Sequence, residues 1–268
     1  MPKSSKTITN PQTIEMTMAA LPGATHRKGL PAKDSITSMT TSAAVGFTIL
    51  HTNEVDGYEE AAQGPGFLAA AKAKLPKGDD FGGTARKAAK LSISAAKTEN
   101  FKDVKALIAS LVPDAKMIAH KPKIGTGPTS KRVKEEERNI HVTAFMYAAS
   151  READNDFHLI IGRDLSATPE MYMTMELSGL PAKTDASFAQ LKTTRDAFKA
   201  FFKSIPGGKL PGLTYDFYHP PVPVQIDGSL FFDMTHATGQ RPGPPSLKSR
   251  MPVIWEVHPI TKIVLKKP

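Results

Sequence analysis

The order of the β-rich runs constrains the fold of this 268-residue chain more than any other feature. Five such runs, separated by turn residues, fill the second half, and a segment with helical spacing stands between the third and the fourth. The expected elements are strands over 139–148, 156–162, 171–178, 222–234 and 253–265 and a helix over 185–204. The order β-β-β-α-β-β matches the five-stranded, partly open OB barrel, although other small α+β sheets share it. We therefore predict a mainly β protein with an OB-like barrel in its C-terminal half.

The first half of the chain has a different composition. Only five aromatic residues precede position 130 and fourteen follow it, so the bulky side chains that build a core lie mainly in the second half. Residues 1–65 are expected to form an extended or partly disordered arm, since their first part is rich in Ser, Thr, Pro and Gly. Residues 66–130 are expected to be a helical segment and linker, and residues 131–268 the OB-like domain. The helices are expected over 67–75, 84–97 and 100–111, and the linker over 121–130.

Composition excludes several classes of protein and site. The apolar runs are far shorter than the roughly 18 to 20 residues that cross a bilayer, and the first 20 residues lack the apolar core of a signal peptide. A cytoplasmic location without a membrane partner is therefore expected. The chain has no cysteine, so a metal site would have to be built from His, Asp and Glu.

The net charge of +9 favours anionic partners such as nucleic acid or phosphate esters. The densest basic cluster, within residues 121–134, runs directly into three glutamates at 135–137. A solvated linker explains such a charge run at least as well as a binding patch does. A partner in an oligomer or assembly could also be contacted through the N-terminal arm, because arms of this composition often order only against a partner.

Three segments far apart in the chain place carboxyl and imidazole groups on or beside an apolar run. They are Glu152 to Ile161, Phe231 to His236 and Trp255 to Pro259. Such groups are expensive to bury singly, so we expect them to converge on a metal, on a ligand or on one another.

Strand parity indicates which of these side chains can meet. Successive side chains alternate across a strand, so Asp156 and His158 share one face of the second strand, and Glu256 and His258 share one face of the fifth. Glu176 in the third strand lies on a face that could adjoin them.

A further acid and imidazole, Asp233 and His236, are three residues apart and cannot share a face of a regular strand. A turn or bulge is therefore required to bring them together.

The most concrete functional hypothesis is a divalent metal that supports hydrolysis of a phosphodiester, as in a nuclease. Whether the protein is an enzyme is left open by the sequence. The candidate metal ligands are Asp156, His158, Glu176, Asp233, Glu256 and His258, and the candidate catalytic residues are Asp156, His158, Glu256 and His258. Arg163 or Lys262 could neutralise charge on the phosphorus. Mixed oxygen and nitrogen ligands favour Mn, Zn or Fe over Mg or Ca.

Other interpretations stay open beside this one. The acids and imidazoles could simply pair with each other in a structural network, or form a ligand site without metal. The domain could be a non-enzymatic OB-like module that binds an anionic ligand or nucleic acid, or a structural component of an assembly. Aromatic residues over 215–218 could stack on bases, but loop packing is the commoner role for such residues beside a Pro-rich strand entry.

Four motifs carry a resemblance to known sequences. They are Asp154-Asn-Asp-Phe-His-Leu-Ile-Ile-Gly162, Glu176-Leu-Ser-Gly-Leu-Pro181, Gly228-Ser-Leu-Phe-Phe-Asp-Met-Thr-His236 and Trp255-Glu-Val-His-Pro-Ile-Thr-Lys-Ile263. In combination they resemble a group of largely uncharacterised bacterial proteins, over about the second half of the chain. The resemblance implies a shared small β-barrel domain with clustered acid and His groups, and no particular activity.

Overall fold

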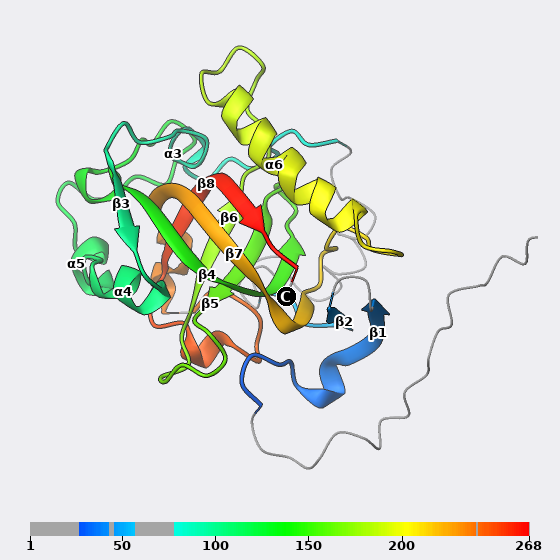
Figure 1. Cartoon of the computed structure of the whole chain (residues 1–268). Coiled ribbons are helices and arrows are strands. Elements are labelled where there is room, and N and C mark those ends of the chain that lie inside the picture. The colour runs from blue at the N-terminus through cyan, green and yellow to red at the C-terminus, as the bar shows by residue number, and fades with distance from the viewer. Residues whose placement is uncertain (1–26, 43–45, 57–77, 240, 268) are drawn as a thin grey trace, which may run out of the picture.

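One mixed eight-stranded sheet dominates the part of the chain that the computed structural model describes, which is residues 27–42, 46–56, 78–239 and 241–267. The strand order is β1-β2-β7-β8-β6-β5-β4-β3 (Figure 1). The strands are β1 (Ile36–Ser42), β2 (Phe47–Thr52), β3 (Thr98–Phe101), β4 (Asn139–Arg151), β5 (Phe157–Gly162), β6 (Tyr172–Leu177), β7 (Asp216–Phe232) and β8 (Trp255–Leu265). The helices are α3 (Lys87–Lys90), α4 (Val104–Ala109), α5 (Asp114–Ile118) and α6 (Phe188–Lys203). Short 3₁₀ turns are η2 (Lys33–Ser35), η3 (Lys134–Glu136), η4 (Met234–Thr238) and η5 (Lys248–Arg250).

Five of these strands form a ring. β4 pairs with both β5 and β7, and the circuit is completed by the pairs β5–β6, β6–β8 and β8–β7. The β6–β8 pair is parallel and the other four are antiparallel. The protein is therefore a mixed α/β structure, mostly sheet, with a ring of five strands.

The five strands and the long helix predicted for the second half correspond to β4, β5, β6, α6, β7 and β8. The main difference is β7, which begins at Asp216 rather than near residue 222 and passes through three prolines at 220, 221 and 223. Proline lacks an N–H donor and signals an edge or an interruption, which is why the sequence predicts a later start. The early part of β7 pairs with β2, so this strand joins the N-terminal segments to the ring.

The predicted elements of the first half differ more. The helix expected over 67–75 lies outside the described residues. The helix expected over 84–97 is reduced to the single turn α3, because Arg86 adopts a left-handed backbone (φ 47°) and residues after Leu91 extend. The helix expected over 100–111 starts only at Val104, where the Asp103 side chain caps it by accepting from the Ala106 N–H at 2.8 Å.

Two further strand pairings were not predicted. β3 pairs in parallel with β4, and β1 and β2 form an antiparallel pair within the region expected to be an arm. β1 is polar and rich in Thr and Ser, so its composition alone resembles an unfolded segment, whereas β2 contributes buried Phe47, Ile49 and Leu50. The division of the chain near residue 130 into separately folding parts stays a prediction.

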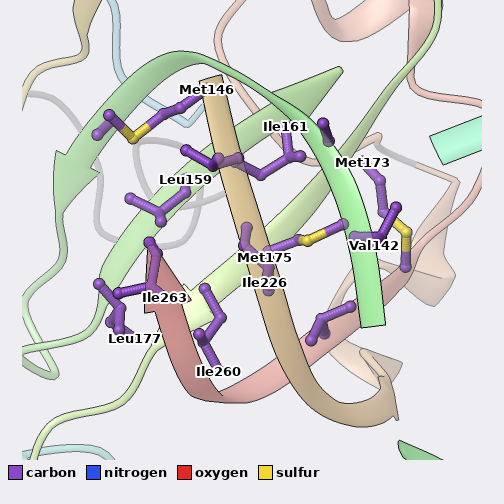
Figure 2. Close-up of a cluster of buried hydrophobic side chains, with 14 of the residues drawn as sticks. Val142, Met146, Leu159, Ile161, Met173, Met175, Leu177, Ile226, Ile260 and Ile263 are labelled. Carbon is purple, nitrogen blue, oxygen red and sulfur yellow. The ribbon is translucent and has the colours of Figure 1, made fainter. Parts of the chain in front are cut away.

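The core lies inside the ring. Figure 2 shows aliphatic and methionine side chains from all five strands packed between the ribbons, among them Leu159, Met175 and Ile263. Phe198 and Phe202 of α6 belong to the same core, and Phe157 stacks obliquely on Phe198 with ring centroids 5.0 Å apart. α6 lies against β8 and β6 (Figure 1). In the described part of the chain, no helix has the length and apolarity needed to cross a membrane.

Candidate metal centre on the outer face of the ring

The carboxyl and imidazole groups lie on the face of the ring strands that points away from the core. On β5, Phe157, Leu159 and Ile161 point inward, so His158, which lies between Phe157 and Leu159, points outward. The register places His158 opposite Glu176 of β6, and Thr174 of β6 beside Glu256 of β8. Strand alternation and register together therefore build a row of acids and imidazoles across three neighbouring strands.

Glu176 is the centre of this row. Its Oε1 lies 3.2 Å from Nε2 of His158, and its Oε2 lies 2.6 Å from Nδ1 of His258. These contacts are short, yet His158 Nε2, His258 Nδ1 and Glu176 Oε2 have no aligned hydrogen-bond partner in the described residues. The three side chains are 3 % exposed or less. The nitrogen and oxygen atoms thus approach one another without the N–H···O alignment that would satisfy them.

Asp156 approaches the row from the turn before β5. The Gly179 N–H donates to its Oδ1 at 2.6 Å, which fixes the carboxyl group. Its Oδ2 points to the cluster, 3.4 Å from Nε2 of His258, and also lacks an aligned hydrogen bond within the described chain. Asp156 and His258 are fully buried.

Lys90 of α3 supplies the ammonium group of the cluster. Its Nζ lies 3.5 Å from Asp154, 3.7 Å from Asp156 and 3.9 Å from Glu176. Burial would lower the pKa of Lys90, but Glu176 and the two aspartates outweigh it and raise that pKa well above its usual value. Lys90 is therefore charged in the metal-free protein.

Two arginines, Arg86 and Arg132, fix the segment that carries Lys90. Arg86 donates to both oxygens of Glu136 at 2.7 Å, a bidentate pair that is almost fully buried. Arg132 donates to the carbonyls of Ala89 and Ser92 at 2.8 and 2.9 Å, and to the carbonyl of His258 at 2.7 Å. α3 is thereby tied to β8 beside the acids.

His158 is oriented through its other nitrogen. Nδ1 lies 2.7 Å from Oε1 of Glu152 and 2.9 Å from the hydroxyl of Tyr215. A carboxylate on one imidazole nitrogen is the usual arrangement around a metal-binding histidine, since it fixes the ring and the tautomer. Burial opposes a proton on His158, but Glu152, Tyr215 and Glu176 raise its pKa well above the usual value in the absence of a cation.

A second acid and imidazole pair follows β7, in the turn η4. Asp233 caps this turn by accepting from the Thr235 N–H at 2.8 Å, and its Oδ2 lies 2.6 Å from Nδ1 of His236. Burial opposes the charge of His236, while Asp233 and Asp56 raise its pKa to about 9. This is the turn that the three-residue spacing requires.

Carboxyl groups outnumber cations in the whole buried cluster. Among the described residues, seven carboxyls face one ammonium and three imidazoles: Asp56, Glu152, Asp154, Asp156, Glu176, Asp233 and Glu256 against Lys90, His158, His236 and His258. Burial and the neighbouring acids raise the pKa values of Asp156 and Glu256 well above normal. Glu176 has the opposite shift, because His258 and Lys90 overcome its burial and hold its pKa well below normal.

The structure brings all six sequence-predicted ligands into three adjoining groups that could hold a metal ion. In each group the candidate ligand atoms lie within 4.8 Å of one another. The groups are Glu152, His158 and Glu176; Asp156, Glu176 and His258; and Asp233, His236 and Glu256.

The two basic residues suggested from sequence lie elsewhere. Arg163 donates to Asp103 at 3.1 Å and borders a small separate cavity, and Lys262 is exposed on β8.

Sequence reasoning did not assign Lys90, Glu152, Asp154, Asp56 or Tyr215 to the site. Glu152 and Asp154 belong to the acid-rich segment just before β5 that the sequence analysis singled out. Their closeness in sequence to Asp156 and His158 could have assigned them to the site. Tyr215 is buried against His158, so it is unavailable for stacking on an external base. Lys90 carries no local signal, because it reaches the acids only through the tertiary position of α3.

Solvent reaches the cluster at one edge. The side chains of Asp154, Lys90 and Glu152 are 20 %, 13 % and 13 % exposed, whereas those of Asp156 and His258 are fully covered. Beside α3 there is also an open groove of about 490 Å³, bordered by Lys87, Leu91, Lys131 and Asp185 among others. Solvent therefore reaches Asp154, Lys90 and Glu152 more readily than it reaches Asp156 and His258.

Comparison with protein-family models, with curated proteins and with solved structures found no match.

Proposed function

We propose that this protein is a metal-dependent hydrolase of phosphodiesters, with the cation held on the outer face of the ring by Asp156, Glu176 and His258. The observation that carries the proposal is the set of buried acid and imidazole atoms that face one another without aligned hydrogen bonds. Orphaned buried polar atoms of this kind are costly, and a divalent cation between them would satisfy several at once. The surplus of carboxyl groups supports the same conclusion, because a divalent cation offsets two of them.

The donor set supports a borderline transition metal. Imidazole nitrogen suits Zn, Fe and Mn, whereas Mg and Ca are bound mainly by oxygen. We propose Mn, Zn or Fe as the cation.

We further propose that the ring is an OB-like barrel. The element order β4-β5-β6-α6-β7-β8 supports this assignment, because the helix stands between the third and fourth ring strands. The parallel β6–β8 pair, which closes the circuit, supports it too. OB barrels carry unrelated functions, including metal-dependent phosphodiesterase sites on the barrel surface, so the fold accommodates the proposed site without specifying it.

The residues of this chain would divide the chemistry among them. A bound cation supplies water of lowered pKa and a positive charge next to the phosphorus. Glu256 stands next to His258, with Oε2 3.8 Å from Nδ1 and no aligned hydrogen bond in the described structure, and is placed to accept the proton of that water. Lys90, at the solvent edge, would neutralise the phosphate as it enters. The net charge of +9 favours an anionic substrate such as nucleic acid.

The test is hydrolysis of bis(p-nitrophenyl) phosphate and of DNA and RNA oligonucleotides by the purified full chain. We expect activity with Mn²⁺, Zn²⁺ or Fe²⁺ that a chelator abolishes, and a loss of about 10²–10⁴-fold in Glu176→Gln. Glu135→Gln is a matched control, because Glu135 also contacts an imidazole, that of His120 at 3.2 Å, but outside the cluster. Absence of hydrolysis in a metal-loaded, folded protein on all three substrates would overturn the proposal.

The second candidate function is a binding module without catalysis. The groove beside α3 favours it, since about 490 Å³ is within the usual size range of ligand sites and Lys87 and Lys131 border it. Binding of an oligonucleotide that weakens with salt, survives chelator and is lost in Lys87→Ala with Lys131→Ala would support this function instead.

A further inference from the structure

Glu176 divides its two carboxylate oxygens between two different imidazoles. Oε1 faces Nε2 of His158 at 3.2 Å, and Oε2 faces Nδ1 of His258 at 2.6 Å. Neither nitrogen has an aligned hydrogen bond within the described residues, and both rings are at least 98 % buried. A carboxylate that only accepted hydrogen bonds from two histidines would align with their N–H groups. Its placement suits instead a carboxylate that joins two cations, each bound by one oxygen and one imidazole.

The surroundings of the two imidazoles differ in a way that supports two positions. His158 is held from its Nδ1 side by Glu152 and Tyr215, so Nε2 is the nitrogen presented to Glu176. His258 has Asp156 on its other side, with Oδ2 3.4 Å from Nε2. The Asp156 group is thus fully covered at Asp156 and His258, whereas the His158 group includes Glu152, whose side chain is 13 % exposed at the solvent edge.

We propose that the centre binds two divalent cations bridged by Glu176. The first is the cation of the proposed function, held by Asp156, His258 and Oε2 of Glu176. The second is held by Nε2 of His158 and Oε1 of Glu176, with Glu152 orienting the imidazole, and water or substrate oxygen completes its coordination. The inference rests on the proposed function for the first cation and deepens it. Paired cations about 3.5–4 Å apart are well suited to phosphoryl transfer, since they stabilise both the attacking and the leaving oxygen.

The experiment counts bound metal, independently of any activity. Metal-free full-length protein is titrated with Mn²⁺, and bound Mn²⁺ is measured by elemental analysis and by electron paramagnetic resonance. We expect two cations per chain and a spectrum broadened by magnetic coupling between them. His158→Gln should leave one cation with an uncoupled spectrum, and Glu135→Gln should keep two.

A milder variant protects the test against misfolding. Glu152→Gln retains the imidazole and should weaken the second cation by about 10–100-fold while the first keeps its affinity. A wild-type protein that saturates with one Mn²⁺, or a His158→Gln protein that still binds two with coupling, would overturn the bridge.

Hydrolysis assayed on the same samples separates the two proposals. Two coupled cations without hydrolysis would contradict the hydrolase and leave the bridged centre standing. One cation with hydrolysis would contradict the bridge and leave the hydrolase standing.

Discussion

The two faces of the same three strands differ sharply in chemistry although both are buried. The inner face of β5, β6 and β8 is apolar, with residues such as Leu159, Met175 and Ile263 (Figure 2). The outer face of those strands carries His158, Glu176, Glu256 and His258, which are 3 % exposed or less. Alternating apolar and polar residues usually mark a strand with one side in water, but here the covering segments bury the polar side too.

The inner and outer faces differ in what burial does to stability: burial of the inner side chains stabilises the fold, and burial of the outer groups costs free energy. Burial of the inner side chains is favourable by roughly 1.5–3 kcal/mol for each large one. Burial of the outer groups is unfavourable unless each finds a partner, and atoms of Glu176, Glu256 and His258 find no aligned hydrogen bond within the described chain. The outer face is therefore best understood as a site that the inner core stabilises.

The largest expected effect is that of removing metal, which acts only on the outer face. At a cation concentration about 1,000-fold above Kd, binding stabilises the native state by about 4 kcal/mol. We expect a chelator to lower the Tm of the metal-loaded protein by roughly 8–16 °C, as measured by calorimetry. An unchanged Tm, with metal shown to be removed, would contradict a structural coupling between the cation and the cluster.

The next effect acts only on the inner face. Leu159→Ala removes buried methyl groups next to His158 in sequence but on the opposite side of β5. We expect the free energy of unfolding to fall by about 3 kcal/mol, because a cavity remains, while bound Mn²⁺ per folded chain is unchanged. The volume-conserving Leu159→Met should cost less than about 1.5 kcal/mol. Loss of metal in either variant, at a temperature where the protein is folded, would mean that the two faces are not independent.

Much of this comparison could be predicted from the sequence, because it depends on local rules. Strand parity placed Glu256 and His258 on one face of β8, and the spacing of Asp233 and His236 required a turn, which the structure shows as η4. Periodicity located α6, which begins at Phe188 rather than at residue 185.

What could not be predicted depends on tertiary contacts. Lys90 enters the cluster because Arg86 and Arg132 tie α3 to β7 and β8, and no local pattern encodes that position. The same holds for Tyr215, which reaches His158 from a segment 57 residues away in sequence. The pairing of β2 with β7 was likewise hidden, since prolines interrupt the pattern of β7.

A smaller effect is expected when Glu256 of the outer face is replaced by a group that does not titrate. In the metal-free protein this change should raise the free energy of unfolding, whereas Leu159→Ala lowers it. The pKa of Glu256 is raised well above its unfolded value by burial and by Glu176 and Asp233. A carboxyl with a raised native pKa binds its proton more tightly in the native state, so it lowers stability as pH rises above about 4.5.

Glu256→Gln should therefore stabilise the metal-free protein at pH 7.5 by about 1–2 kcal/mol, with little gain at pH 5, in urea denaturation. The same variant should bind metal more weakly. Glu135→Gln, on the surface, should change neither quantity. A metal-free Glu256→Gln that is less stable than wild type would show that the carboxyl group contributes favourable contacts. Burial of the outer face would then stabilise the fold as burial of the inner face does.

The smallest effect concerns a His and Asp pair outside the cluster, in which one acid meets one imidazole. Nδ1 of His51 in β2 lies 2.7 Å from Oδ1 of Asp216 in β7, and the hydrogen bond to Asp216 raises the pKa of His51 although burial opposes it. A raised native pKa means that this contribution to stability is fully present below about pH 6.5 and is lost as pH rises through the native pKa. Because the His51 side chain is 31 % exposed, we expect less than about 1 kcal/mol. Urea denaturation at pH 5.5 and pH 8.5 should show a larger loss in wild type than in His51→Gln. Wild type and His51→Gln share the buried imidazoles of the cluster, so the difference between their losses of stability reports His51 alone. Equal losses in the two proteins would show that the His51–Asp216 pair contributes as little to stability as an isolated surface charge.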